Sequence, residues 1–222
     1  AKSDFGRLLP ISVIINKLSQ KGADLIGSTC WRCYRRQMIV KNQILFDEDL
    51  QTGEDGVFNL TVYQHASNYL FMDAVLYNYR YNPDSLVNKY YPNKFDMVIK
   101  AHLSEDEQLK ILSAMTDVMV SRRAISLLEK TYNCMLNIFH PDNSSGFKEK
   151  FQELKYVSAD RDVQNAVALV KDGKLRQLGR GSRIVFWLVI HKIYIIGVLA
   201  IIALDRSQRV VNKRRTRTVS YT

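Results

Sequence analysis

The chain has little cysteine and lacks a complete set of metal-ligating side chains. Its three cysteines are Cys30, Cys33 and Cys134, and its four histidines are scattered along the sequence. The C-x-x-C spacing of Cys30 and Cys33 allows a redox pair or half of a zinc site, but neither a second C-x-x-C nor paired histidines are present to complete a tetrahedral site. Three cysteines favour a reducing compartment. We expect the histidines to be surface or packing residues rather than bases.

Acidic residues are almost absent from the C-terminal part of the chain. Residues 174–222 contain eleven Lys and Arg but only one acid, Asp205, so they hold the whole formal net charge of +10. The other 173 residues carry 21 basic and 21 acidic side chains, so the sequence pI near 9.5 is a property of the tail. The basic cluster at 213–217 would suit nucleic acid, but an apolar run nearby makes membrane lipid the expected anion, and we predict no nucleic-acid partner.

The apolar run, residues 184–204, is interrupted only by His191 and Lys192. Its length permits a transmembrane helix. However, Lys192 near its centre costs about 2.5–3.5 kcal/mol on insertion, and basic residues flank both ends, whereas the positive-inside rule prefers one basic side. These features favour a helix that lies in the membrane interface or is re-entrant, with a spanning helix and a buried soluble helix as alternatives. We therefore predict that residues 184–217 bind an anionic membrane surface, at the cytoplasmic face of the cell membrane.

An adjacent acidic pair, Glu54 and Asp55, follows Gly53 at the start of an expected amphipathic helix. Glycine permits a backbone conformation that other residues rarely adopt, and the helix directs its unpaired N–H groups and positive dipole end toward the pair. A carboxylate in this position stays ionised and can take a proton from an alcohol. The same position suits a helix cap, because acidic residues are common in first turns. From spacing alone both roles stay open.

Longer patterns surround this pair. Residues 31–59 contain W-x-x-Y-R-R and later G-E-D-x-x-F, and residues 69–86 contain Y-x-Y-R followed by a serine. In this order the patterns resemble the acceptor-side half of bacterial family-2 glycosyltransferases, in which the second stretch forms a strand pair. Within the first pattern, Arg35 and Arg36 are expected to be a solvated helix start rather than ligands.

The resemblance implies roles for five side chains. Asp55 matches the position of the family's catalytic base, with Glu54 as its neighbour. Arg80 and Ser85 match residues of a mobile loop that closes over the donor diphosphate, where a guanidinium grips phosphate oxygens and offsets charge on the leaving group. Trp31 would offer a flat apolar face to a sugar ring, with a core or lid aromatic as the alternative.

The resemblance also implies an activity, which is transfer of a sugar from a nucleotide-sugar donor to a hydroxyl of a glycan or lipid-linked acceptor, with inversion. In the intact enzyme a divalent metal, Mg²⁺ or Mn²⁺, would neutralise the donor diphosphate, through ligands that lie outside this segment. A non-catalytic peripheral membrane protein with a helical body is the alternative.

The N-terminal part of the chain differs from the family pattern. The nucleotide-binding half normally precedes the acceptor motif, but only 30 residues precede Trp31. Residues 11–16 echo the family's opening strand, yet we place them in a helix, residues 8–20. The acid-x-acid triplet at 47–49 lies in a loop where family members commonly show F-D-E-x-L, and the one at 160–162 falls in a polar helical stretch with no strand before it, so neither is expected to be the metal site. We therefore expect an N-terminally truncated segment that is inactive alone.

Helical periodicity dominates the rest of the sequence. Apolar residues recur at threes and fours across residues 94–139, and the turn-rich stretch at 141–146 ends this block as a linker. Two further helices are expected at 147–158 and 160–178, and strands only in a small pair around 69–81.

The predicted fold class is α+β, mostly α. Residues 1–90 would be the C-terminal remnant of a GT-A-type α/β catalytic domain, residues 91–180 a helical extension, and residues 181–222 a membrane-interacting helix with a basic tail.

Overall fold

The computed structural model describes residues 8–21, 26–30, 32–70, 72, 77, 78, 89–170 and 178–190, with side chains described for these ranges except 17–21 and 188–190. The chain divides into two compact units. The first comprises Ala1–Tyr79 and Asp96–Arg123, and the second comprises Arg80–Phe95 and Ala124–Thr222.

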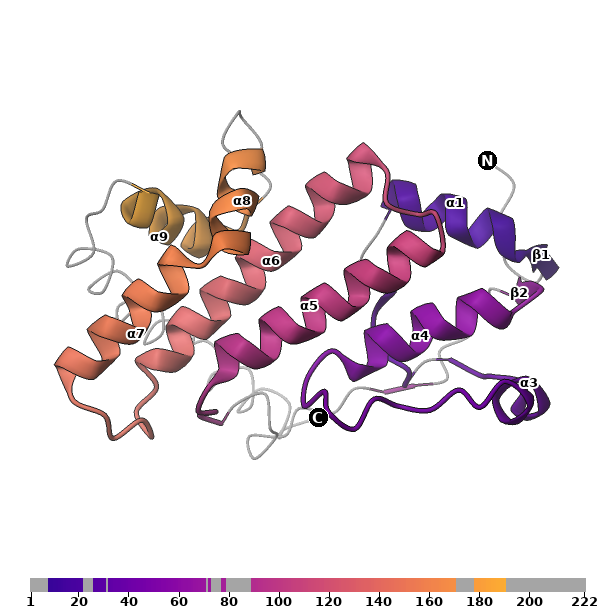
Figure 1. Cartoon of the computed structure of the whole chain (residues 1–222), viewed down its shortest axis with the longest axis horizontal. Helices are drawn as coiled ribbons and strands as arrows, with labels where there is room; N and C mark the ends of the chain where they lie inside the picture. Colours follow the sequence, from indigo (N-terminus) through magenta and orange to yellow (C-terminus); the bar gives the residue numbers. More distant parts are fainter. Residues whose placement is uncertain are drawn as a thin grey trace, which may run out of the picture. The chain divides into compact units, whose positions relative to one another are not determined.

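The first unit is helical with one small sheet (Figure 1). Its elements are β1 (Leu8–Pro10), α1 (Ile11–Lys21), α3 (Arg36–Lys41), α4 (Glu54–His65), β2 (Asn68–Leu70), most of α5 (Lys94–Ile111) and the start of α6 (Asp117–Ile138). The first residues of α5 and the remainder of α6 belong to the second unit.

The sheet consists of β1 and β2 in antiparallel pairing, with Leu8 opposite Leu70 and Pro10 opposite Asn68. A strand pair was expected around 69–81, and β2 overlaps the start of that range at residues 69 and 70, but its partner strand comes from residues 8–10. The helix expected from residue 8 begins only at Ile11, because Pro10 lacks an N–H and favours extended geometry in the residue before it. Most of residues 71–88 lie outside the described residues.

Helix α4 is the centre of the first unit. Its Leu60 and Tyr63 belong to the main core cluster. Its Phe58 and Val62 pack in a second cluster with residues of α3 and the segment after it. The members of the main cluster are Ile14, Ile26, Leu60, Tyr63, Leu109, Leu112, Ala114 and Met119. A helix that is apolar on more than one side is buried, so α4 is fixed in position within this unit.

Helices α4 and α5 run alongside each other in the same direction (Figure 1). An added Cβ at Gly53, just before α4, would meet Ala101 of α5. Near the other end of α4, the side-chain amide of Gln64 donates to that of Gln108. The start of α4 is therefore packed against a long neighbouring helix.

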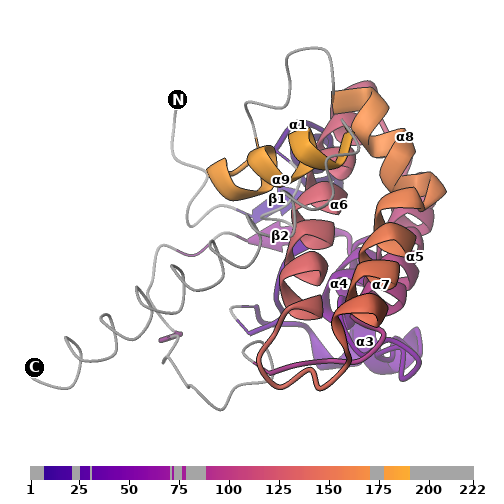
Figure 2. The same ribbon diagram turned by 90° about the vertical axis from the view of Figure 1, so that its left-hand side faces the viewer.

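The second unit contains the rest of α6 with α7 (Phe147–Ala159), α8 (Arg161–Val170) and α9 (Arg180–Ile190). Helices α7 and α8 meet at a bend at Asp160 (Figure 2). The Asp160 carboxylate accepts hydrogen bonds from the backbone N–H groups of Asp162 and Val163, at 2.9 and 3.0 Å, and so caps α8. The predicted linker at 141–146 is confirmed as a non-helical connection between α6 and α7.

Helix α9 is held to α6 by Glu129, whose Oε1 accepts hydrogen bonds from the Gly179 N–H and the Ser182 hydroxyl. One face of α9 buries Val185 and Phe186 completely, while Ile184 and Trp187 are half exposed. Within the described part of the chain, none of the helices combines the length and apolar character needed to cross a membrane. The apolar run predicted over 184–204 continues past the end of α9, outside the described residues.

The predicted class is confirmed at the level of a mostly helical chain with a small two-stranded sheet. The helical block predicted at 94–139 is two helices, α5 and α6, separated by residues 112–116. The helix predicted at 147–158 is α7. The one predicted at 160–178 is described only as far as Val170. The division at residues 90 and 180 stays a prediction.

Candidate functional site

Gly53 is the N-cap of α4 and has a left-handed backbone, with φ 77°. This is the kind of backbone conformation that glycine was expected to permit before the acidic pair. A second constraint comes from packing, since an added Cβ would lie 2.7 Å from the Ala101 Cβ. At Gly56, in the same turn, an added Cβ would lie 2.5 Å from Glu105 Oε1. The two glycines therefore allow the turn that carries the acids to approach α5 closely.

The carboxylate of Asp55 makes a tertiary contact. It is half-buried, and its Oδ1 accepts a hydrogen bond from the Thr29 hydroxyl at 2.6 Å. The N-cap of α4 is Gly53, and no side chain makes a cap hydrogen bond there. The bond to Thr29 thus connects two segments that are 26 residues apart, which a local helix cap does not do. Asp55 also lies in the first turn, where the helix dipole favours negative charge.

Glu54 differs from its neighbour. It lies in the same first turn and is also half-buried. Among the described residues, no hydrogen bond or ion pair involves its side chain. Of the two acids, Asp55 is therefore the one whose orientation is fixed.

Asn59 is one helical turn after Asp55 and is fully buried. Its side-chain N–H groups donate to the carbonyl oxygens of Ile26 and Gly27, and its Oδ1 accepts from the Tyr34 hydroxyl at 2.6 Å. One buried amide therefore holds both ends of the segment that contains Thr29.

Tyr63 is one turn further along α4 and contacts the same segment. Its hydroxyl accepts a hydrogen bond from the Arg32 guanidinium, which also lies 5.9 Å from the Tyr63 ring centroid. Arg32 in turn donates from Nε to the Ser28 carbonyl at 3.1 Å. Burial raises the pKa of Tyr63, and the nearby Arg32 charge offsets part of that rise. At neutral pH this phenol is protonated.

Asp55, Asn59 and Tyr63 are spaced by four residues and so share one side of α4. We call residues 26–34 the anchored segment, because all three side chains bond to it. Burial also raises the pKa of Tyr34, which ends this segment, to about 12. The anchored segment is therefore held against α4 by neutral hydroxyl and amide groups as well as by one carboxylate.

A group of aromatic rings packs on an adjacent side of α4. Phe58 stacks on Phe46 with ring centroids 4.2 Å apart, and it meets Tyr34 edge to face at 5.4 Å. Arg35 and Arg36 are exposed at the start of α3, as predicted. The ring contacts of Phe58 hold Tyr34 and Phe46 against α4. Arg35 and Arg36 are not part of these contacts.

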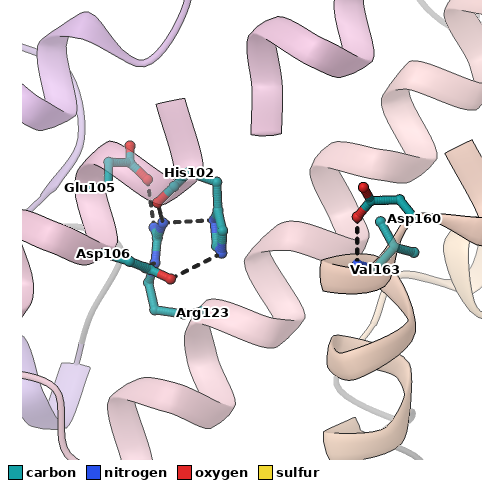
Figure 3. A network of polar contacts seen from close by, with 6 residues as sticks. All are labelled: His102, Glu105, Asp106, Arg123, Asp160 and Val163. Carbon is teal, nitrogen blue, oxygen red and sulfur yellow. Dashed lines mark hydrogen bonds and ion pairs between the residues drawn. The ribbon is translucent and has the colours of Figure 1, made fainter. Parts of the chain in front are cut away.

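A buried polar cluster lies on α5 and the start of α6, and the sequence analysis did not identify it (Figure 3). The Arg123 guanidinium donates to Glu105 at 2.6 Å, to Asp106 at 2.5 Å and to the His102 carbonyl at 2.9 Å. Its Nη2 is also 2.7 Å from His102 Nδ1. A guanidinium only donates, so Nδ1 accepts and the ring proton is on Nε2, which lies 3.5 Å from Asp106 Oδ2.

This cluster supports the turn that carries the acidic pair. Glu105 Oε2 pairs with Arg123, while its Oε1 faces the position of a Cβ at Gly56. The signal in the sequence was the spacing of His102, Glu105 and Asp106, which places them on one face of α5. That spacing is also common on solvated helix faces, so only the burial distinguishes the two cases.

The described residues do not fit a metal site. No group of three or more His, Cys, Asp or Glu side chains in the described ranges is arranged to hold an ion. Among the acid-x-acid triplets, Asp47 accepts a hydrogen bond from the Asp49 backbone N–H, and Asp160 caps α8. Cys30 and Cys33 are exposed free thiols.

Three of the predicted site residues, Trp31, Arg80 and Ser85, lie outside the described residues. Cys30 and Arg32 flank Trp31 in sequence, and both belong to the anchored segment. Of the five predicted site residues, the structure thus describes only the acidic pair, and their roles stay predictions.

Over 82 residues the chain is 39% identical to an uncharacterized glycosyltransferase, EpsJ, of Bacillus subtilis (strain 168). Part of this chain is thus related to a glycosyltransferase. The matched stretch is 36% of this chain but 23% of that relative, so the chain spans less than a quarter of the relative's length. No protein-family model and no solved structure matches the chain.

Proposed function

We propose that this chain is the acceptor-side part of an inverting family-2 glycosyltransferase of the GT-A type, with Asp55 as the catalytic base. One observation carries the proposal: the Asp55 carboxylate, in the first turn of a buried helix, is oriented by the Thr29 hydroxyl at 2.6 Å. The relationship to a glycosyltransferase over 82 residues supports the same reaction class.

The reaction needs a base next to the acceptor. Asp55 takes the proton of an acceptor hydroxyl, on a glycan or a lipid-linked glycan, as the hydroxyl oxygen attacks the anomeric carbon of the donor sugar. The bond between that carbon and the nucleoside diphosphate breaks, and the diphosphate leaves with the bonding electron pair. The product carries a new glycosidic bond with inverted configuration, and the proton ends on Asp55.

The other predicted residues complete this proposal. Glu54 lies beside the base, and Trp31 offers a ring face to a sugar. Arg80 and Ser85 donate hydrogen bonds to the donor diphosphate as negative charge builds on it. No group of three or more potential metal ligands is found among the described residues. We assign the Mg²⁺ or Mn²⁺ of the intact enzyme to ligands outside this segment.

The test is an Asp55→Asn variant of the complete gene product, assayed for release of nucleoside diphosphate from a panel of nucleotide sugars. Asn keeps the shape and the bond to Thr29 but cannot take a proton. We expect kcat to fall by about 10²- to 10⁴-fold with little change in KM for the donor. Glu54→Gln, in the same turn, is the matched control and should lose much less. Activity within about threefold of wild type in Asp55→Asn would refute the proposed base.

We also propose that residues 184–217 bind an anionic membrane surface at the cytoplasmic face of the cell membrane. The described start of this region lies in α9, where Ile184 and Trp187 are half exposed, and Arg180 at the N-terminal end of the helix is exposed just before the region. Apolar and basic side chains in this arrangement suit the boundary between acyl chains and anionic head groups.

A non-catalytic peripheral membrane protein is the second candidate, and the same exposed face of α9 favours it. The two candidates differ in one outcome. If the complete gene product binds anionic vesicles but Asp55→Asn leaves sugar transfer unchanged, the chain acts in membrane attachment alone.

A further inference from the structure

Thr29 makes the one hydrogen bond of the described structure that reaches the Asp55 carboxylate. An ionised carboxylate has no proton to give, so the Thr29 hydroxyl donates to it. At 2.6 Å this is a short, charge-assisted bond. It occupies Oδ1, and because the carboxylate is planar, it also restricts the direction in which Oδ2 points.

Thr29 is itself held in place. Asn59 binds the backbone just before it, through the carbonyls of Ile26 and Gly27. Tyr63 binds Arg32 just after it. The hydroxyl therefore donates from a segment that is fixed on both sides, and it can hold Asp55 rather than follow its movements.

We propose that Thr29 is a positioning residue for Asp55, which rests on the proposed role of Asp55 as the base. The hydroxyl of Thr29 fixes Oδ1 and leaves Oδ2 to receive the proton of the acceptor hydroxyl. A base held in one orientation needs no rearrangement when the acceptor binds, so the contribution of Thr29 is to the rate of transfer and not to substrate affinity.

A structural alternative makes a different prediction. If Thr29 only tethers the anchored segment, its loss should loosen that segment whether or not Asp55 is present. If Thr29 acts through Asp55, its loss should matter only while the carboxylate is the base. The two roles therefore separate in a double-mutant cycle.

The experiment measures kcat and donor KM for Thr29→Val and Thr29→Ser in the complete gene product, each with Asp55 and with Asp55→Asn. With Asp55 present, we expect Thr29→Val to lower kcat by about ten- to a hundredfold, the usual effect of a hydrogen bond to a charged group, with KM nearly unchanged. Serine keeps the hydroxyl and should restore most of the rate. With Asp55→Asn, Thr29→Val should change the residual kcat by less than about twofold.

A second measurement reports on the segment directly. Hydrogen exchange of the backbone amides of residues 26–34 follows opening of the anchored segment. Because Asn59 and Tyr63 still hold the segment, the exchange rates should stay within about twofold of wild type in Thr29→Val. Labelling of the buried Cys134 by a small thiol reagent reports any general loosening. Thr61→Val is the matched control on α4, since that hydroxyl bonds only the Val57 carbonyl within the helix, and its kcat should be unchanged.

Each outcome decides the inference. An unchanged kcat in Thr29→Val, an equal loss in both Asp55 backgrounds, or much faster amide exchange in residues 26–34 would overturn it. Retained activity in Asp55→Asn would instead overturn the proposed function. Loss of activity in Asp55→Asn with a normal Thr29→Val would leave the proposed function standing and remove only the positioning role.

Discussion

Arg123 and Glu105 form a buried ion pair at 2.6 Å, with side chains that are 7% and 5% exposed. The same guanidinium also binds Asp106 and the backbone of α5, so its donors are spread over several partners. Because Glu105 lies against Gly56, this pair supports the first turn of α4, which carries Asp55.

Arg123→Ala should strongly destabilise the protein. It leaves Glu105 and Asp106 without their cation, and breaking a buried pair by removing one partner costs about 3–5 kcal/mol. Urea unfolding of the chain measures this as a lower midpoint. Arg161→Ala is the matched control, because that side chain is 88% exposed and its ion pair with Asp162 is long, at 3.7 Å. Similar midpoints for the two variants would show that the buried cluster does not stabilise the fold.

The stability of this cluster should depend on pH through Asp106. Burial raises the pKa of Asp106 above its ordinary value of 3.8, and Arg123 offsets only part of the rise. When the pKa of an acid is higher in the folded state than in the unfolded state, the acid contributes to stability at pH values below its unfolded pKa. This contribution is lost as the pH rises through the folded-state pKa. The free energy of unfolding of the wild type should therefore fall, relative to that of Asp106→Asn, as pH rises above 3.8. Urea unfolding across this range checks the sign, and a constant or rising difference would contradict it.

Gly53→Ala should destabilise α4. The left-handed backbone and the 2.7 Å approach to the Ala101 Cβ both oppose a side chain there, at a combined cost of about 2–3 kcal/mol. Gly146→Ala is the control, because Gly146 has a φ of −68°. The nearest atom to its added Cβ is the end of the exposed, flexible Glu149 side chain. Thermal unfolding should give a lower midpoint for Gly53→Ala than for Gly146→Ala. Equal midpoints would mean that the start of α4 accommodates the added methyl group.

Binding of the complete gene product to lipid vesicles should depend on α9. Replacing Ile184 and Trp187 together by serine removes two half-exposed apolar side chains of that helix, and it should weaken binding to vesicles with anionic lipid by about tenfold or more. Phe147→Ser is the control, because this aromatic residue on α7 is 63% exposed but lies outside the proposed region. Co-sedimentation measures both. Equal loss in the two variants would indicate non-specific adsorption.

Local features of the site followed from the sequence. A glycine before two acids predicted a left-handed turn at the start of a helix, and Gly53 has that backbone. The polar linker after α6 and the exposed helix start at Arg35 and Arg36 were likewise predictable. In each case the residues that decide the structure are adjacent in the chain.

Contacts over long sequence separations were not predictable in the same way. The pairing of β1 with β2 joins residues 8–10 to residues 68–70. Thr29 is an ordinary polar residue in a loop, and the role proposed for it depends on the fold, which brings its hydroxyl to Asp55. The spacing of His102, Glu105 and Asp106 suits a solvated helix face as well as a buried one.

The sequence by itself determined the helical character of the chain, the glycine turn before the acidic pair and the concentration of positive charge in residues 174–222. These depend on backbone preference and composition, which act over a few neighbouring residues. Only the tertiary structure decided that Asp55 bonds to Thr29 and that Arg123 is buried with Glu105. Burial and the meeting of distant groups depend on how helices pack, and packing is a property of the whole fold.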